Sequence, residues 1–152
     1  MHNTSHQPDS KERYQVNAFD LTTDLFCTFS NQVIHQVIDL DSKIRYEILN
    51  KAVDRATLAH PIVRCRIIRD QDTLFWQECS DFCINDHIHR LSSSNPANLL
   101  HHALSYPLDP DRGNLFTIVI IENSDKTRGI LVITVHHIVM MPGVSKIFPD
   151  LS

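Results

Sequence analysis

The chain has 152 residues, of which 42% are hydrophobic and 21% charged, and it carries a formal net charge of −4. This length favours one domain with a core of its own, and an acidic balance without a basic cluster argues against a nucleic-acid surface. No apolar run approaches the roughly 18 residues that a membrane span requires.

Residues 1–16 are polar and contain Pro8, which predicts a flexible leader before a domain at residues 17–152. The leader has no apolar h-region, so the sequence shows no secretory signal peptide. Cysteines without an export signal are typical of reduced thiols, and we expect a cytoplasmic protein. The cysteines are Cys27, Cys65, Cys79 and Cys83.

The first predicted helix and strand follow the leader. Spaced apolar residues over 17–29 predict a short helix, for which Asp20 and Thr22 are candidate caps. Residues 31–40 are rich in β-branched side chains and alternate, which predicts a strand. One face of this strand carries Val33, His35 and Val37, and the other carries Ile34, Gln36 and Ile38.

A longer amphipathic helix is predicted over residues 43–60. Its apolar residues recur at helical spacing, and Asp41 and Ser42 are available as N-caps. Pro61 disfavours the helical region at His60 and should end the helix there.

A hairpin and a second helix come next. Residues 62–70 and 73–78 alternate around a polar turn, which predicts two antiparallel strands. Residues 79–94 mix apolar and polar side chains without a period, so no element is predicted there. Asn95 and Pro96 then begin a helix with leucines at helical spacing.

Two near-continuous apolar runs complete the predicted fold. A turn-rich connection at 107–114 leads into residues 115–122 and 130–136, whose spacing predicts an antiparallel hairpin with a long loop. Apolar residues on both faces predict a central position in the sheet, covered on both sides. The expected fold class is α+β, a two-layer sandwich of a mostly antiparallel sheet with helices packed on it.

Two adjacent histidines, His136 and His137, close the last predicted strand before the turn signal Pro142-Gly143. Successive side chains of a strand point to opposite faces, so one imidazole should face the interior and the other a cleft or solvent. Histidine titrates closest to neutrality, and a ring held beside a cleft suits general-base catalysis. Taken alone, the pair is explained more simply as two partly buried histidines that close a strand.

Three segments together resemble the condensation-domain superfamily of acyltransferases. Val135-His136-His137-Ile138-Val139-Met140 resembles its HHxxxDG signature. The stretch 58–66 (LAHPIVRCR) is similar to its RHPxLRxR segment, and 107–116 (PLDPDRGNLF) to its PLDPxxGPLF segment. The superfamily includes nonribosomal peptide synthetase condensation domains, polyketide-associated acyltransferases, wax-ester synthases and chloramphenicol acetyltransferase. The resemblance implies a chloramphenicol acetyltransferase-like half-domain.

The resemblance also implies the chemistry and the site residues. The second histidine, His137, would be the general base that takes a proton from an amine or hydroxyl acceptor as it attacks an acyl thioester. His136 would point away and support the strand. The implied donor is acyl-CoA or an acyl group on the phosphopantetheine arm of a carrier protein. No tightly bound cofactor and no metal are implied.

The sequence departs from the family motif at its end. The family's aspartate falls at Met141 and its glycine at Pro142, so a glycine comes one place late, at Gly143. In the family this aspartate pairs with an arginine and shapes the catalytic loop. Arg64 is the matching arginine, with a structural role. Without the aspartate it needs another anion or contact with water, because an unpaired buried charge is costly.

Members of the superfamily are longer than this chain, and their two similar halves enclose a substrate tunnel. The chain stops soon after the histidine motif, which implies an N-terminal half truncated there. The second wall would then come from a missing C-terminal half or from a homo-oligomer, as in chloramphenicol acetyltransferase, where a neighbouring subunit supplies it. The alternative is a non-catalytic remnant or protein-interaction module of the same fold.

Two other chemistries would use the cysteines. Candidate metal ligands gather in one stretch: Cys79, Cys83, Asp86, His87, His89, His101 and His102. Their spacing does not match the common zinc patterns, so a thiol-containing loop with surface histidines is the favoured interpretation. Cys27 and Cys65 are most simply small core residues. A cysteine–histidine nucleophile pair stays open as an alternative.

Overall fold

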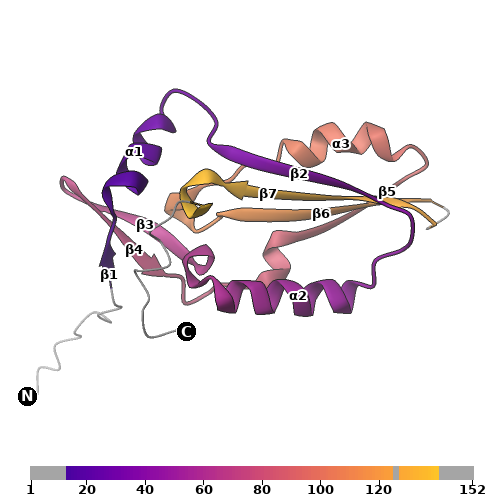
Figure 1. Ribbon diagram of the computed structural model, residues 1–152, viewed down its shortest axis with the longest axis horizontal. Coiled ribbons are helices and arrows are strands. Elements are labelled where there is room, and N and C mark those ends of the chain that lie inside the picture. Colours follow the sequence, from indigo (N-terminus) through magenta and orange to yellow (C-terminus); the bar gives the residue numbers. More distant parts are fainter. Residues whose placement is uncertain (1–12, 125–126, 141–152) are drawn as a thin grey trace, which may run out of the picture.

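The computed structural model describes residues 13–124 and 127–140. In this part of the chain a four-stranded sheet lies between two helices (Figure 1). Its strands, in order across the sheet, are β2 (Val33–Leu40), β7 (Gly129–His136), β6 (Phe116–Asn123) and β5 (Ile88–Ser93). β7 runs antiparallel to both β2 and β6, whereas β5 is parallel to β6. The predicted central hairpin is therefore confirmed.

A three-stranded sheet lies at one end of the larger one (Figure 1). Its strands, in order, are β1 (Arg13–Gln15), β4 (Thr73–Glu78) and β3 (Cys65–Asp70). β3 and β4 form the predicted hairpin. β1 pairs with β4, and Val16 after it is buried. The expectation of a flexible leader over residues 1–16 is wrong for residues 13–16, which belong to this sheet and its core; residues 1–12 lie outside the described part.

Three helices occur in the described residues: α1 (Ala18–Phe26), α2 (Tyr46–Ala59) and α3 (Pro96–Leu104). All three were predicted, and none of them is long and apolar enough to cross a membrane. The cap of α1 differs from the expectation. Asn17 Oδ1 accepts the N–H of Asp20 at 2.9 Å, and the Thr22 hydroxyl donates to a carbonyl within the helix. The side chain of Asp20 instead turns inward.

The start of α2 also differs from the expectation, whereas its end agrees. Arg45 occupies the N-cap position without a side-chain hydrogen bond, so neither Asp41 nor Ser42 caps the helix. His60 is the C-cap, and Pro61 begins a short 3-10 turn. The expected effect of this proline is confirmed.

The core of the larger sheet lies on both of its faces. The α2 face buries Val53, Ile88, Phe116, Ile118, Ile120 and Leu131. The α3 face buries Ala103, Val119, Ile121 and Val132. Every residue of β6 except Asn123 is buried, as expected for a central strand with helices on both sides. The α+β class with a mostly antiparallel sheet is confirmed, and the sheet is the middle layer between α2 and α3.

A third cluster joins the small sheet to the end of β7. Its buried members are Val16, Ile62, Cys65, Ile67, Trp76, Leu115 and Ile138. Asp20 is fully buried, and its Oδ2 accepts the indole N–H of Trp76 at 3.1 Å. This bond ties α1 to the cluster and explains why Asp20 does not cap its own helix. Leu115 and Ile138 flank the histidine pair in space, so the cluster fixes the region where the candidate site lies.

The sequence did not predict β5. This strand lies at the edge of the sheet and carries Arg90, Ser92 and Ser93 beside two buried or half-buried apolar side chains, Ile88 and Leu91. It therefore lacks the alternation of a half-buried strand. Its parallel pairing with β6 uses α3 as the crossover, which is how parallel neighbours are ordinarily joined.

Candidate functional site

The end of β7 is held by two backbone hydrogen bonds that point in opposite directions. The N–H of His136 donates to the carbonyl of Leu115 on the β6 side, and the N–H of His137 donates to the carbonyl of Gln32 on the β2 side, both at 2.8 Å. A 3-10 turn, η4 (His137–Met140), follows directly. The histidine pair therefore lies on a rigid strand end and not on a loose loop.

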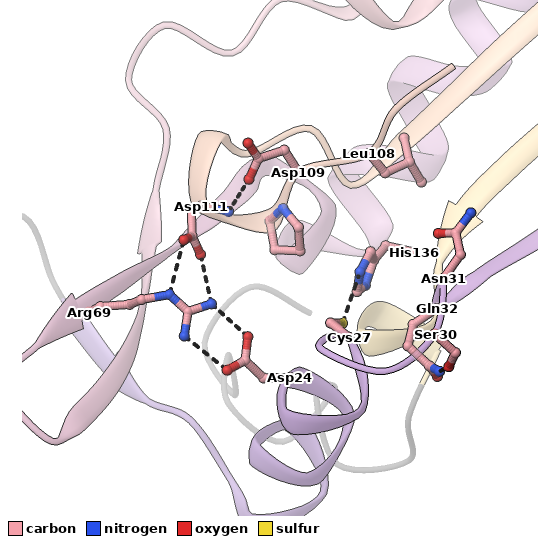
Figure 2. A pocket seen from close by; sticks show the side chains of 11 residues that line it. Asp24, Cys27, Ser30, Asn31, Gln32, Arg69, Leu108, Asp109, Asp111 and His136 are labelled. Atoms are coloured by element: carbon pink, nitrogen blue, oxygen red, sulfur yellow. Dashed lines mark hydrogen bonds and ion pairs between the residues drawn. The ribbon is translucent and has the colours of Figure 1, made fainter. Parts of the chain in front are cut away.

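The side chain of His136 reaches a pocket of about 250 Å³ (Figure 2). Four parts of the chain supply its walls: the end of α1 with the loop after it (within residues 24–32), Arg69 on β3, the turn at 108–111 and His136 itself. Only 5% of His136 is exposed. The side chain of His136 lies on the α3 face of the sheet, because it shares a face with Val132, which comes four residues earlier on β7 and is buried on that face. The pocket opens where this face reaches the end of β7.

The structure thus places His136, and not His137, in this pocket. We expected the reverse arrangement, with His137 at the cleft and His136 pointing away. The sequence predicts that the two rings lie on opposite sides of the strand, but it does not predict which side carries the pocket. That side is set by α1 and the turn at 108–111, which cover the α3 face at this end.

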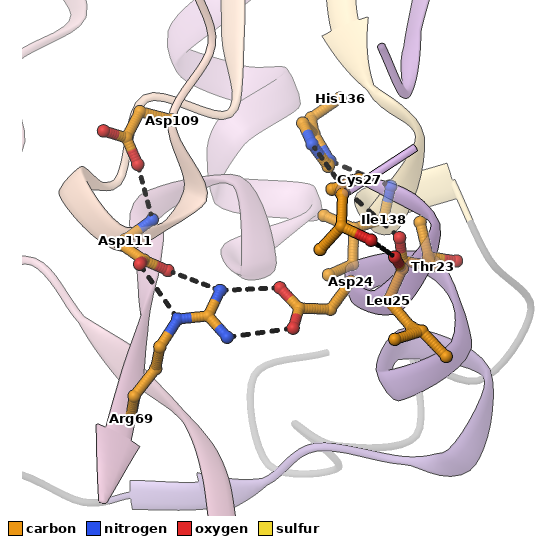
Figure 3. A network of polar contacts seen from close by, with 10 residues as sticks. Thr23, Asp24, Leu25, Cys27, Arg69, Asp109, Asp111, His136 and Ile138 are labelled. Atoms are coloured by element: carbon orange, nitrogen blue, oxygen red, sulfur yellow. Dashed lines mark hydrogen bonds and ion pairs between the residues drawn. The ribbon is translucent and has the colours of Figure 1, made fainter. Parts of the chain in front are cut away.

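Hydrogen bonds at both ring nitrogens assign the tautomer of His136 (Figure 3). Nδ1 accepts the N–H of Ile138 at 3.3 Å, so the neutral ring carries its proton on Nε2. Nε2 lies 3.6 Å from Cys27 Sγ. The Cys27 thiol in turn donates to the carbonyl of Thr23 at 3.2 Å. The chain of donors therefore runs from Ile138 through the imidazole and the thiol to the backbone of α1.

Electrostatics keep both members of this pair neutral. Burial lowers the pKa of His136, and the neighbouring His137 adds to this effect, while Asp24 and Asp109 oppose it. Burial likewise raises the pKa of Cys27, with Asp24 adding to it. A catalytic cysteine–histidine pair requires a thiolate beside an imidazolium. The contact between Cys27 and His136 exists, but its protonation states are opposite to that chemistry.

Arg69 closes the other side of the pocket with two carboxylates (Figure 2). Its guanidinium donates two hydrogen bonds to Asp24 on α1, at 2.7 and 2.9 Å, and two to Asp111, at 3.0 and 3.1 Å. These bonds raise the pKa of Arg69 above its ordinary value, those of Asp24 most strongly. Arg69 therefore joins α1, β3 and the turn at Asp111, and sequence patterns did not single it out.

The segment 107–116, one of the three that carry the family resemblance, forms a turn beside the pocket. Asp109 caps this turn, its Oδ1 accepting the N–H of Asp111 at 3.0 Å. Gly113 has a φ of +76°, and a Cβ there would lie 2.6 Å from Cys79 Sγ. Both features require glycine at this position. The sequence predicts the turn correctly, but it does not show that Asp109 and Asp111 line a pocket.

His137 is half-buried and does not line the pocket. Its Nδ1 is buried and has no hydrogen-bond partner among the described residues. Leaving a buried polar atom unsatisfied costs about 1–3 kcal/mol, and such an atom in a native protein often marks a strained or functional position. His137 therefore stays a candidate for chemistry, at a different surface from the pocket.

Arg64 makes no ion pair with a described residue. Its guanidinium carbon lies 5.0 Å from the centre of the Phe82 ring, and its Nε is buried with no hydrogen-bond partner in the described part of the chain. Stacking on an aromatic face is one way to hold an arginine that has no carboxylate partner there. Met141 and Pro142, where the motif departs from the family, lie outside the described residues.

The suggested metal ligands do not come together. In residues 13–124 and 127–140 no group of three or more histidine, cysteine, aspartate or glutamate side chains is placed to hold a metal ion. His87 instead stacks between Phe82 and Phe116, and its Nδ1–H donates to the carbonyl of Phe116 at 3.0 Å. His89 stacks on Tyr106.

Solved structures provide the comparison that identifies the fold. The condensation domain of the polyketide synthase MokA superposes on 82% of this chain, with a TM-score of 0.65 and 11% sequence identity. The starter condensation domain of the rhizomide synthetase RzmA covers 87%, at a TM-score of 0.66 and 16% identity. The first condensation domain of the CDA synthetase covers 84%, at 0.64 and 13%. The chain has a condensation-domain fold.

The match covers most of this chain but only part of each solved structure. This chain spans only 30%, 34% and 36% of the MokA, RzmA and CDA synthetase chains, about a third of their length. The sequence itself matches no protein-family model and no curated protein. The resemblance to condensation domains that the three segments predict is confirmed at the level of the fold, and a half-domain is consistent with this partial coverage.

Proposed function

We propose that the chain forms part of an acyl-transfer site of the condensation type. An acyl group moves from a CoA or carrier-protein thioester to an amine or hydroxyl acceptor. The observation that carries the proposal is the His136–His137 pair, held at the end of a central strand of a condensation-domain fold. His137 acts as the general base, while His136 and Arg64 position the strand end around it.

In the proposed reaction the acceptor nitrogen or oxygen attacks the thioester carbonyl while His137 removes its proton. The tetrahedral intermediate then collapses and expels the thiolate of CoA or of the pantetheine arm, which takes the proton from His137 and leaves as the thiol. Nδ1 of His137 is buried and has no hydrogen-bond partner among the described residues, so Nε2 of this half-buried ring is the nitrogen that takes the acceptor's proton. His136 suits a supporting role, since its Nδ1 is occupied and its Nε2 proton already points to Cys27.

A second body is part of the proposal. Apolar side chains of α1 and the loop after it are exposed beside the pocket, including Leu25 at 62% and Phe29 at 80%. Such exposure is typical of a surface that another chain or domain covers. The cover is a C-terminal half, a second copy, or a carrier protein that delivers the acyl group.

Octanoyl-CoA is a suitable donor probe, because a RzmA starter condensation domain was solved in complex with C8-CoA. The purified chain is incubated with C8-CoA and a panel of primary amines and alcohols, and acylated products are detected by mass spectrometry. Thiol release alone is not a sufficient readout, since the chain has four free cysteines of its own. His137→Ala should lower the rate by about 100-fold or more.

The matched control is His101→Ala, which removes an exposed histidine of α3 outside the pocket and should leave the rate unchanged. Absence of any acylated product, or full activity of the His137 variant, would contradict the proposal.

A non-catalytic interaction module is the second candidate function. It is favoured by the absence of His137 from the pocket lining and by the pocket's size of about 250 Å³, below the roughly 300–1,000 Å³ usual for small-molecule sites. This candidate predicts that calorimetry detects no heat of C8-CoA binding. Binding of C8-CoA with a 1:1 stoichiometry would exclude it.

A further inference from the structure

β2 is an edge strand, and its outer side is unusually unprotected. It pairs along all eight residues with β7, and no strand of the described residues lies on its other side. Soluble proteins commonly guard such edges with lysine, proline or bulges. β2 reads Val-Ile-His-Gln-Val-Ile-Asp-Leu and contains none of these. Ile34 and Val37, one on each face, are 41% and 46% exposed.

Two hydrogen bonds show which backbone groups of β2 point outward. Gln32 accepts from His137, so even-numbered residues of this strand turn their N–H and C=O groups toward β7. The bond from His136 to Leu115 agrees, because even-numbered residues of β7 point to β6. The outward-pointing groups are therefore those of Val33, His35, Val37 and Asp39.

We propose that β2 pairs in antiparallel fashion with β2 of a second copy of this chain, around a two-fold axis at Val37. In this register the outward N–H and C=O of Val37 bond the same groups of the second copy, as in an ordinary hydrogen-bonded antiparallel pair. His35 of each copy lies opposite Asp39 of the other. The two four-stranded sheets then form one continuous sheet.

Charge selects this register. Asp39 makes no ion pair within the described residues. Among these residues His35 bonds through Nδ1, which lies 2.9 Å from the Thr134 hydroxyl. Moving the axis by one residue toward the N-terminus places Asp39 opposite Val33 of the second copy. Moving it the other way places Asp39 opposite Val37. Of these three registers, only the proposed one places each His35 opposite an Asp39 of the other copy. It also brings the two Val37 side chains together on the axis.

The surroundings of β2 leave room for a second strand. α3 packs on β5, β6 and β7, so the face that carries His35, Val37 and Asp39 is open at β2. On the opposite face Ile34 lies across from Leu40 of the second copy, which covers apolar surface on both chains. The inference is independent of acyl transfer, because it uses only the edge of β2.

Sedimentation of the purified chain over a concentration series tests the pairing. Wild type should approach twice the monomer mass as concentration rises. Val37→Lys, which puts two like charges together on the axis, should remain monomeric. Ile48→Lys makes the same change at a 50% exposed site on α2 and should still dimerise. A monomeric wild type up to its solubility limit, or a dimeric Val37→Lys, would overturn the proposal.

Charge variants test the register separately from the existence of a dimer. His35→Asp sets acid against acid and should weaken dimerisation about tenfold, since each opposed pair contributes a few tenths to 1 kcal/mol and the axis doubles it. Adding Asp39→Lys to His35→Asp again places an acid opposite a hydrogen-bond donor of the other copy and should restore wild-type affinity. Failure of this double variant to recover would reject the register even if a dimer forms.

Hydrogen exchange gives a readout that a change in fold alone would not produce. The amides of His35, Val37 and Asp39 should gain protection as the protein is concentrated, whereas those of Gln36 and Ile38 already bond β7 and should not change. Equal behaviour of the two sets would contradict outward pairing. Circular dichroism of each variant confirms that its monomer is folded.

Discussion

The ring of His136 is fixed between a backbone N–H and a thiol, and this arrangement fits only the neutral form. An imidazolium would have to donate from Nδ1, but Nδ1 faces the N–H of Ile138, which is itself a donor. Burial acts in the same direction, because it penalises the charged ring. The hydrogen-bond geometry and the lowered pKa of His136 thus have a common consequence, a histidine that resists protonation.

This resistance predicts a pH dependence of stability. The pKa of His136 is lowered in the folded protein from its ordinary value of 6.5, so the unfolded chain binds this proton more readily. The free energy of unfolding should therefore fall as the pH drops through and below about 6.5. Urea unfolding at about pH 7.5 and 5.5 should show a smaller difference between the two values for His136→Asn than for wild type.

His101→Asn is the control, since this residue is exposed on α3, and it should keep the wild-type difference. Burial also lowers the pKa of His89. Its contribution to the pH dependence of the free energy of unfolding is the same in wild type and in both variants, so it cancels when they are compared. An unchanged pH dependence in His136→Asn would show that this ring is not the group responsible.

For single residues, the sequence shows which side chains could carry chemistry, but it does not show which of them meet in the fold. The histidine pair stands out because two imidazoles close an apolar run. Cys27, Asp24 and Arg69 could not be recognised, because the first two lie at the end of α1 and Arg69 lies on β3, and their meeting depends on how α1 lies against β3. The turn-rich connection predicted at 107–114 is confirmed, and this turn makes Asp109 part of the pocket wall.

Among the elements, α1 depends most on a few polar contacts. Apolar side chains on one side of it are exposed, and two buried or half-buried carboxylates hold its other side: Asp20 bonds Trp76 and Asp24 bonds Arg69. Arg69 also bonds Asp111, so one guanidinium joins three segments that are far apart in the sequence. Bidentate arginine pairs of this kind add geometric specificity as well as energy.

Arg69→Gln should therefore loosen α1 and the pocket together. The Arg69 side chain is 48% exposed, so solvent screening limits the expected loss to about 1 kcal/mol at low ionic strength, and it should shrink as salt is added. Urea unfolding at low and high salt measures both effects. Arg13→Gln removes a longer ion pair, 3.6 Å from Asp70, and should cost less than about 0.5 kcal/mol.

The accuracy of the predicted elements followed the strength of their periodicity. The strongly patterned elements α2, β6 and β7 were found, whereas β5 was missed because an edge strand with polar residues carries little signal. The predicted caps of α1 and α2 were wrong for a related reason. Asp20 has the chemistry of a cap but was taken by Trp76, a tertiary contact that no local pattern reveals.

For the molecule as a whole, stability should be concentrated in the central strands. Ile120 is 2% exposed within the α2-face cluster, so Ile120→Ala should cost about 2–5 kcal/mol through lost burial and the cavity left behind. Ile48→Ala makes the same change at a 50% exposed site on α2 and should cost less than about 1 kcal/mol. Equilibrium unfolding of both variants measures the contrast, and similar losses would show that the centre is not dominant.

The order of strands in the larger sheet has a consequence for the protein's synthesis. β2 leaves the ribosome well before its neighbour β7, which is the last strand of the described residues to be made. Until β7 arrives, both backbone sides of an apolar segment are open on the nascent chain, and such segments readily associate with one another. We expect chaperones to bind β2 during translation and to release it only when the final hairpin closes the sheet.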